Sequence, residues 1–409
     1  MKSLLSKGLI LTSIFCILLT SCNGGGGGLS AGGGIDGTGI MSAGVVSAFG
    51  SIIVNGTEFD TSEATVIING EKVGVGDDVV RDNLEIGMVV RVEGRIKKDG
   101  SAVADRVNFT TSVNGPVESV GGLDPDTNEK EIVVLGQTVI VNVITKFKPD
   151  TIDIDSIAKD DVVEVSGYFD DTGAIRATFI EKTGSFITES IVEVTGFVTN
   201  LNIGETFEIN GLTVNYALIA DDLPEGIPAD DLFVEVEGTL ATPGGEMLAT
   251  DIELGDELDG EDGDEFEIMG FVTDVVSDFE FTIGNQLVIA DADTVVVDPL
   301  PGGIQPGVKL EAEGSLEGGI LYAWEIEFWK PDQIEVEGIV DDGVVLISGF
   351  PEFTFEERED QLFQTNNETE FEDVEPDEIK ARMELEVKGV PVDIDQSVVV
   401  ADKVSFELE

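Results

Sequence analysis

The sequence predicts an all-β protein that consists of five tandem small antiparallel β-barrel modules, each of about 70–75 residues. One motif of alternating apolar and charged residues, closed by a glycine, occurs five times, and the closing glycines are 73, 71, 76 and 75 residues apart. Constant spacing over such lengths is typical of tandem modules. Short valine- and isoleucine-rich alternating runs fill the chain, and 3.6-residue periodicity is scarce, which favours strands. The closing glycines are Gly94, Gly167, Gly238, Gly314 and Gly389.

The recurring motif reads as a strand, which we call the signature strand of each module. Its first and third positions are apolar, as in Val234 and Val236, whereas its second position carries a charge. This period of two is typical of an antiparallel strand with one face on a core and the other in solvent. We therefore expect the closing glycine to turn the chain and the second-position side chains to face solvent. These side chains are Arg91, Glu164, Glu235, Glu311 and Glu386.

Each module is expected to contain a hairpin, a further strand, the signature strand and a closing strand. Asn55-Gly56, between two β-rich runs, is a strong hairpin signal. Corresponding turns occur at Leu135-Gly136, Asn210-Gly211 and Gly284-Asn285, with Ser348-Gly349 a weaker counterpart. The fifth module is the least regular, because residues 355–367 insert charged and amide side chains. The predicted modules are 41–112, 113–187, 188–258, 259–330 and 331–409.

The N-terminus carries the features of a secretory signal. Lys2 and Lys7 precede an apolar run over residues 8–19, which is too short to span a bilayer. The following Leu19-Thr20-Ser21-Cys22 resembles a bacterial lipobox, so residues 1–21 are expected to be a lipoprotein signal peptide and Cys22 the lipidated residue. An ordinary signal peptide with an incidental Cys22 is the alternative. Several acyl chains on one cysteine would anchor the protein to a membrane.

Residues 22–40 hold the lipidated cysteine and a glycine-rich stretch that reads as a flexible linker. Asn23 follows the cysteine where aspartate is associated with inner-membrane retention, so we expect a lipid-anchored protein of the cell envelope, in the outer membrane of a Gram-negative bacterium. The expected partners are the membrane, through the lipid, and an unknown envelope protein or polymer.

The acidic excess excludes one large class of partners. The chain has 22 basic and 83 acidic residues; removal of residues 1–21 takes Lys2 and Lys7 and leaves a net charge of −63. Nucleic-acid binding requires clustered Lys and Arg to neutralise phosphates, so no nucleic-acid partner is expected. Three explanations of the excess stay open: a solvated surface, calcium or magnesium binding, and recognition of a basic partner.

The residue inventory disfavours most catalysis. Histidine is absent, Cys16 leaves with the signal peptide and Cys22 is taken by lipid, so a His base, a thiolate nucleophile and their usual metal sites are missing. A hydrolase would need a carboxylate pair or a Ser-Lys dyad. We assign no catalytic and no cofactor-binding residues.

Two acidic segments are candidate metal sites. Asp124, Asp126 and Asn128 have the 1-3-5 oxygen spacing of a calcium loop, although the sixth position lacks glycine and the twelfth lacks glutamate. That segment reads first as a hairpin tip. The second segment, between modules 3 and 4, is denser, and Ca²⁺ could draw its oxygens together. Its candidate ligands are Asp256, Asp259, Glu261, Asp262 and Asp264.

Aromatic residues offer a weaker candidate. Tyr322, Trp324 and Phe328 alternate along the closing strand of module 4, so we expect them to share one face and to belong to the core. Trp329 breaks this phase. A local binding patch at these aromatic residues is the alternative.

Several stretches resemble bacterial glycine-rich lipoproteins with tandem modules of a domain-of-unknown-function family. They are residues 49–56 (Phe-Gly-Ser-Ile-Ile-Val-Asn-Gly), 59–61, 87–94, 113–117 and 134–139. The resemblance is specific over about residues 38–187. It implies barrels like those of the oligonucleotide/oligosaccharide-binding (OB) fold, and a cell-envelope location; it implies no activity.

These observations lead to one functional expectation and two alternatives. The chain is expected to be a non-enzymatic cell-envelope lipoprotein that presents tandem β-barrel modules for structural or protein-binding roles. The first alternative is an acidic module array whose stiffness responds to Ca²⁺. The second is a carboxylate-based hydrolase.

Overall fold

The computed structural model describes residues 38–49, 51–97, 101–125, 127–149, 151–221, 223–224, 226–255, 263–356, 358–392 and 397–406. Within these ranges the chain forms 32 strands and a single helix, α1 (Asp77–Asn83), which confirms the all-β prediction. No helix in this part of the chain is long and apolar enough to cross a membrane.

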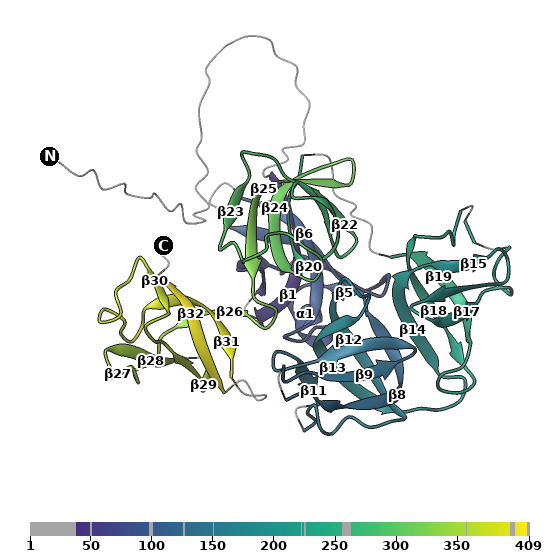
Figure 1. The fold of residues 1–409 in the computed structure, drawn as a ribbon, viewed down its shortest axis with the longest axis horizontal. Coiled ribbons are helices and arrows are strands. Elements are labelled where there is room, and N and C mark those ends of the chain that lie inside the picture. Colours follow the sequence, from purple (N-terminus) through teal and green to yellow (C-terminus); the bar gives the residue numbers. More distant parts are fainter. Residues whose placement is uncertain are drawn as a thin grey trace, which may run out of the picture. The chain divides into compact units, whose positions relative to one another are not determined.

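Each module is a closed ring of strands (Figure 1), as the first one illustrates. Its ring consists of β1 (Thr38–Phe49), β2 (Ile52–Val54), β3 (Thr57–Asp60), β7 (Ala102–Phe109) and β6 (Val89–Ile96). Neighbours in this order are hydrogen-bonded, antiparallel except for β3 with β7, and β6 returns to β1. The predicted small barrel is therefore confirmed. Closure leaves no open sheet edge within the ring.

The other modules repeat this ring, with two differences: β14 is continued by β15 in module 3, and in module 5 the ring closes between β26 and β28 through the single bridge of Val340 with Phe355. The ring of module 2 consists of β8 (Val113–Leu123), β9 (Lys130–Val134), β10 (Gln137–Val141), β13 (Ile175–Ser185) and β12 (Asp161–Phe169). The ring of module 3 consists of β14 (Ile191–Phe197), β15 (Thr199–Asn202), β16 (Thr206–Ile209), β17 (Leu212–Asn215), β19 (Met247–Leu254) and β18 (Phe233–Leu240).

The ring of module 4 consists of β20 (Glu265–Ser277), β21 (Glu280–Ile283), β22 (Gln286–Ile289), β25 (Ile320–Trp329) and β24 (Lys309–Glu317). The ring of module 5 consists of β26 (Ile334–Ile339), β28 (Phe350–Phe355), β29 (Arg358–Gln364), β32 (Val398–Phe406) and β31 (Glu384–Pro391).

Six short strands lie outside the rings. They are β4 (Thr65–Ile68), β5 (Glu71–Val75), β11 (Lys146–Lys148), β23 (Val295–Val297), β27 (Val345–Ile347) and β30 (Glu370–Glu372). In module 1, β5 and α1 lie between the further strand β4 and the signature strand β6, where no element was expected. The helix forms there because Val80 is buried against the core of module 1 while acidic Asp77 and Asp78 occupy its first turn.

The predicted hairpin turns are confirmed in the first four modules. Asn55 and Gly56 have φ of 49° and 73°, which suits the twist of a two-residue hairpin. In module 5, Ser348 and Gly349 also form a hairpin turn, with φ of 55° and 93°, but this turn joins β28 to the additional strand β27 outside the ring. The ring there uses β28 and β29, so its hairpin closes between Phe355 and Arg358, within the inserted segment.

The signature glycines do not turn the chain, contrary to our expectation. Each lies inside its strand, opposite a point where the closing strand carries one extra residue, a β-bulge. A Cβ at Gly167 would come within 2.9 Å of the Cα of Ala177. Glycine is therefore needed for the close crossing of two backbones as the ring closes. The extra residues are Asp105, Thr178, Thr250, Trp324 and Asp402.

Pairs of modules share continuous sheets. Strands β1 and β20 pair in parallel from Ile40 to Ala43 and join modules 1 and 4 in a 13-stranded sheet. Strands β8 and β14 pair through Val113 and Val194, which join modules 2 and 3 in a 12-stranded sheet. Module 5 forms its own seven-stranded sheet. Modules 1 and 4, and likewise modules 2 and 3, are thus joined by backbone hydrogen bonds between strands.

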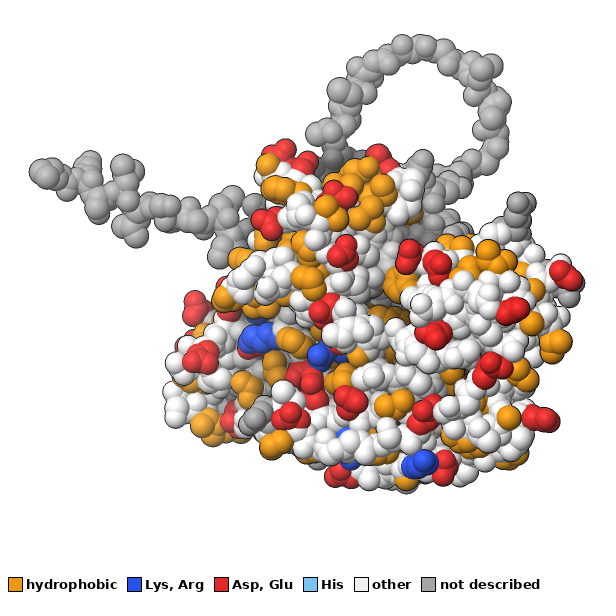
Figure 2. Space-filling model, turned by 45° about the vertical axis from the view of Figure 1, so that its right-hand side comes forward, with side chains coloured by type: hydrophobic (Ala, Val, Ile, Leu, Met, Phe, Trp, Pro, Cys, Tyr) orange, Lys and Arg blue, Asp and Glu red, His pale blue; other side chains and the backbone are white. Residues whose placement is uncertain are grey.

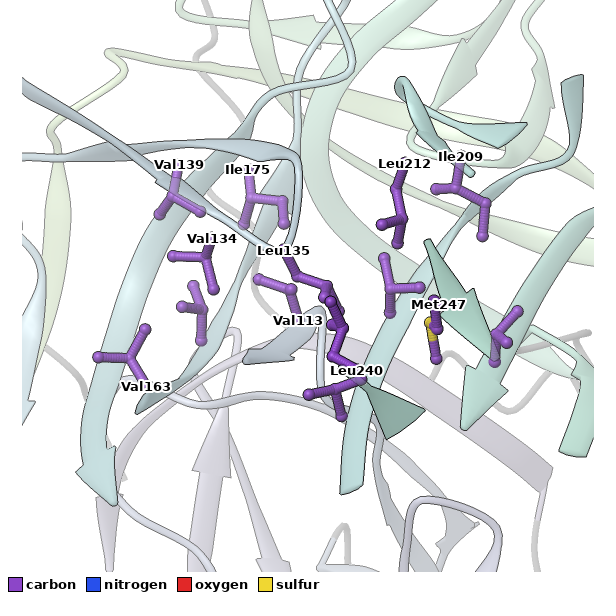
Figure 3. Packing of buried hydrophobic residues seen from close by; sticks show 14 of the residues in the cluster. Val113, Val134, Leu135, Val139, Val163, Ile175, Ile209, Leu212, Leu240 and Met247 are labelled. Carbon is purple, nitrogen blue, oxygen red and sulfur yellow. The ribbon is translucent and has the colours of Figure 1, made fainter. Parts of the chain in front are cut away.

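Modules 2 and 3 also share one hydrophobic core. In Figure 3 the side chain of Leu135 lies between the labelled residues of module 2 and those of module 3. The fully buried Gln137 adds a polar link: its Nε2 donates to the carbonyl of Ile209 (3.1 Å), and Asn210 Nδ2 donates to its Oε1 (2.9 Å). Because these polar atoms are paired, burying them costs little.

Candidate functional site

A cleft of about 630 Å³ lies where modules 1 to 4 meet. Aromatic side chains line much of it, and edge-to-face contacts hold Phe233 between Phe169 (5.6 Å between ring centroids) and Phe197 (4.9 Å). Polar atoms come from Arg91, Asn108 and other side chains. An apolar wall with a few polar groups is the usual form of a ligand site. The aromatic residues of the lining are Tyr168, Phe169, Phe197, Phe233, Phe266 and Phe271.

The cleft lends no support to carboxylate-based hydrolysis. Such catalysis needs two carboxyl groups about 5–10 Å apart on either side of the bond that is cleaved. Among the described residues of the lining, Asp231 is the sole carboxylate.

Three residues of the cleft lining form a small core of modules 2 and 4 together with Trp329. Tyr168, Met269, Phe271 and Trp329 are all buried and pack together. The guanidinium of Arg176 lies 5.2 Å from the centre of the Phe271 ring, so module 2 also contacts module 4 through a cation–π interaction.

The second-position side chains of the signature strands are not in solvent, so this expectation is wrong. Arg91 is buried, and the glutamates at the other four positions are half-buried. The alternation itself is as predicted, since these side chains do point away from their own barrel cores. In modules 3 and 4, residues of module 1 contact the strand beside the signature strand, as Asn69 does at Glu193 and Ser42 does at Glu267.

In module 3, the covered face holds two glutamates side by side. Glu193 on β14 is 7% exposed. It lies directly opposite Glu237 of β18 and therefore diagonally from Glu235 of the same strand. Asn69 of module 1 donates from Nδ2 to the Glu193 carboxylate (2.8 Å). Burial, followed by the neighbouring carboxyl of Glu235, raises the pKa of Glu193 to about 10. The pair is therefore expected to hold a proton at neutral pH.

Module 4 repeats this pair at equivalent positions. Glu267 lies on β20, three residues before Gly270 as Glu193 is before Gly196, and Glu311 holds the second position of the signature strand. Ser42 of module 1 donates to Glu267 (3.1 Å). Burial raises the pKa of Glu267 to about 7 and that of Glu311 well above its usual range. Both shared sheets thus carry a carboxyl pair beside the junction.

These pairs predict a pH dependence of stability. A glutamate whose pKa is higher in the folded than in the unfolded protein stabilises the fold at pH values below its unfolded pKa, near 4.5. This stabilisation is lost as the pH rises through the folded-state pKa. We expect Glu193→Gln to raise the melting temperature at pH 9 by several degrees and to change it little at pH 5, because glutamine needs no proton. Melting curves at both pH values test this.

The control for this experiment is Glu131→Gln, which removes one exposed carboxylate from the same joined pair of modules. This control distinguishes the effect of removing the buried carboxyl group from the effect of lowering the total negative charge of the protein. Equal stabilisation by Glu131→Gln and Glu193→Gln at pH 9 would contradict the role assigned to the pair.

A lysine whose side chain is 12% exposed joins modules 4 and 5. Lys388 of β31 lies with its Nζ 4.5 Å from the centre of the Trp329 ring and 2.9 Å from both carboxylate oxygens of Glu327 on β25. A second carboxylate, from Glu335, lies at 3.5 Å. Although burial opposes its charge, Glu335 and Glu327 raise the pKa of Lys388 above the usual range for lysine. The joint is therefore ionic and mostly shielded from water.

The predicted metal ligands fall largely outside the described residues. This holds for Asp126, Asp256, Asp259, Glu261 and Asp262, and likewise for Cys22. Asp124 and Asn128 lie at the hairpin tip between β8 and β9, where Asn128 N–H donates to the carbonyl of Asp124 (2.8 Å). Within the described ranges, no three Asp or Glu side chains are grouped so as to hold a metal ion. The calcium hypothesis stays a prediction, testable by calorimetric titration with Ca²⁺.

The expectation for the aromatic residues of β25 is wrong for two of the three. Tyr322 and Trp324 are 42% and 41% exposed, whereas Phe328 is buried. The bulge opposite Gly314 inserts Trp324 and changes the phase of the alternation, so residues on either side of it exchange faces. Trp329, which the pattern left unassigned, is buried in the joint just described. The glycine within the signature strand was the one feature of the sequence that could have indicated this bulge and the change of face.

The chain is thus a tandem array of small closed β-barrels whose outer faces are partly used for module-to-module contact. It belongs to the family described as domain of unknown function (DUF5666), whose model matches residues 38–108, 114–181, 195–253, 269–327 and 347–405. No curated protein matches the chain.

Proposed function

We propose that this protein is a non-enzymatic lipoprotein of the cell envelope whose modules form a scaffold for structural or protein-binding roles. The observation that carries the proposal is the joining of modules through shared sheets, β1 with β20 and β8 with β14. Such construction supports a multi-module surface of fixed form. The lipobox-like sequence ending at Cys22 supports the location, and with it attachment to the outer membrane of a Gram-negative bacterium.

The positions of the basic residues support the same proposal. With 22 basic and 83 acidic residues in the chain, a basic side chain could pair with a carboxylate almost anywhere, including within its own module. Several instead join different modules: Lys148 pairs with Glu85 (3.0 Å), and Arg358 donates to the carbonyl of Ser47 (2.7 Å). These contacts connect module 2 with module 1 and module 5 with module 1. Their placement favours a scaffold over a flexible string of independent barrels. On the face shown in Figure 2, Asp and Glu side chains are scattered widely, whereas Lys and Arg side chains are few.

The anchor predicts the outcome of a substitution. Cys22→Ser, expressed from its own signal sequence in a Gram-negative host, is expected to remove the acyl groups and to move nearly all the protein from the membrane fraction to the soluble fraction, because no thiol remains to be lipidated. Intact mass and fractionation measure both effects.

Cys16→Ser is the matched control, since Cys16 lies within the expected signal peptide. It should leave lipidation unchanged. Retention of Cys22→Ser in the membrane fraction, with the mass of the unsubstituted protein, would refute the lipoprotein proposal. If lipidation at Cys22 is found, envelope pull-down with the lipidated protein, followed by mass spectrometry, identifies its partners.

A further inference from the structure

Strand β25 presents two aromatic side chains on the outer surface of module 4. Tyr322 and Trp324 are each about two-fifths exposed, although the chain has only two tryptophans and three tyrosines. Trp324 is the extra residue of the bulge opposite Gly314, and the equivalent bulge residues of the other modules are aspartate or threonine. Barrel closure therefore does not require an aromatic side chain at this position.

Two glutamates lie beside Trp324 at this place in the sheet. Glu313 on β24 lies opposite Glu325 on β25, and both are half-buried. The Trp324 side chain lies close enough to Glu313 for its indole N–H to favour the charged form of that carboxyl group and so to lower its pKa. Burial, and then the neighbouring Glu325, nevertheless raises the pKa of Glu313; burial, and then Glu327, raises the pKa of Glu325. A cation placed between the carboxylates would relieve this crowding of negative charge.

The same strand already binds an ammonium group with this combination of side chains. Five residues after Trp324, the Trp329 ring and the nearby Glu327 carboxylate hold Nζ of Lys388, at 4.5 Å and 2.9 Å. A tryptophan face attracts a cation electrostatically, and a carboxylate adds a charge-assisted hydrogen bond. Trp324 and Glu325 repeat this tryptophan and glutamate composition on the exposed surface.

We propose that Tyr322, Trp324, Glu313 and Glu325 form a docking surface for lysine side chains of a basic protein segment. Charge complementarity supports this occupant, because the chain carries a net charge of −61 even before removal of the signal region. The proposal deepens the proposed binding role by naming the chemistry of a partner. The lysine-binding surface rests on the proposed function only in that the partner would be met in the cell envelope. The binding itself is tested on purified protein.

Fluorine NMR of the mature protein labelled with 5-fluorotryptophan gives one resonance for Trp324 and one for Trp329. Titration with pentalysine in 150 mM NaCl is expected to shift the Trp324 resonance in a saturable way and to leave that of the buried Trp329 unchanged. Glu313→Gln combined with Glu325→Gln should weaken the binding at least fivefold, because both charge-assisted contacts are lost.

Calorimetry supplies the matched comparison. Trp324→Ala should weaken pentalysine binding at least threefold, whereas Phe279→Ala, which removes another exposed aromatic residue from module 4, should not. Binding that Trp324→Ala leaves unchanged would overturn the proposal and show general attraction of a polycation to an acidic protein.

A neutral oligosaccharide, chitopentaose, is the second probe. If it shifts the Trp324 resonance and pentalysine does not, the surface binds carbohydrate and the proposal fails. Because both titrations use soluble purified protein, their outcome is independent of fractionation, which tests the envelope location. Loss of one proposal is therefore distinguishable from loss of the other.

Discussion

Gly167→Ala is expected to destabilise the joined modules 2 and 3 by about 3 kcal/mol, because an added methyl group has no room at a backbone crossing. The Cβ would come within 2.8 Å of the carbonyl carbon of Arg176 and 2.9 Å of the Cα of Ala177. Backbone atoms cannot move aside as a side chain can, so the bulge or the whole β12–β13 pairing has to shift. Calorimetric melting of the mature protein measures the change.

Gly184→Ala is the control within the same strand pair. Gly184 lies on β13, opposite Val162, and a Cβ there has no atom within 4 Å. We expect no loss of stability from this substitution, since alanine also restricts the unfolded chain more than glycine does. Equal melting temperatures for the two variants would show that the signature glycines serve some purpose other than close backbone approach.

Lys388→Met is expected to weaken the attachment of module 5 by about 3–5 kcal/mol, because it leaves two carboxylates partly buried without their cation. Glu327 and Glu335 both lie within 3.5 Å of Nζ in the native protein. In thermal melting, module 5 of the variant should unfold at a lower temperature than in the native protein. The fluorescence of Trp329 should shift to longer wavelength at a lower temperature, since that ring would lose its cover.

Lys380→Met serves as the control, because Lys380 is an exposed cation of the same module. It should leave the transition nearly unchanged. Adding Glu327→Gln to Lys388→Met should restore part of the lost stability by removing one unpaired charge. No difference between Lys388→Met and Lys380→Met would contradict the joint.

Much of the fold follows from local sequence patterns. The recurring signature strand predicted the number of modules, and Asn55-Gly56 and its counterparts predicted the hairpins that the structure contains. Both depend on short-range physics: a period of two sets which face is apolar, and positive φ at the turn favours Asn and Gly. Module 5 departs because its insertion supplies a second possible hairpin.

The candidate site could not be predicted from the same patterns. Glu193 and Glu311 alternate as solvent-facing residues do, and the pattern cannot show that another module covers that face. The burial of these carboxyl groups depends on contacts such as Asn69 with Glu193, between residues 124 positions apart. Trp324 was misplaced because one bulge changes the phase of every later residue on the strand.

The sharing of sheets between modules is tested most directly by amide hydrogen exchange at the junction of modules 2 and 3. The N–H of Thr195 on β14 donates to the carbonyl of Ser112 (3.1 Å), the residue directly before β8, and this bond continues the pairing of Val194 with Val113. Protection of Thr195 therefore depends on contact between β14 and β8. The shared sheet predicts exchange as slow as that of core amides such as Val165. Exchange of Thr195 at the rate of exposed loop amides, with Val165 still protected, would contradict it and indicate independent barrels.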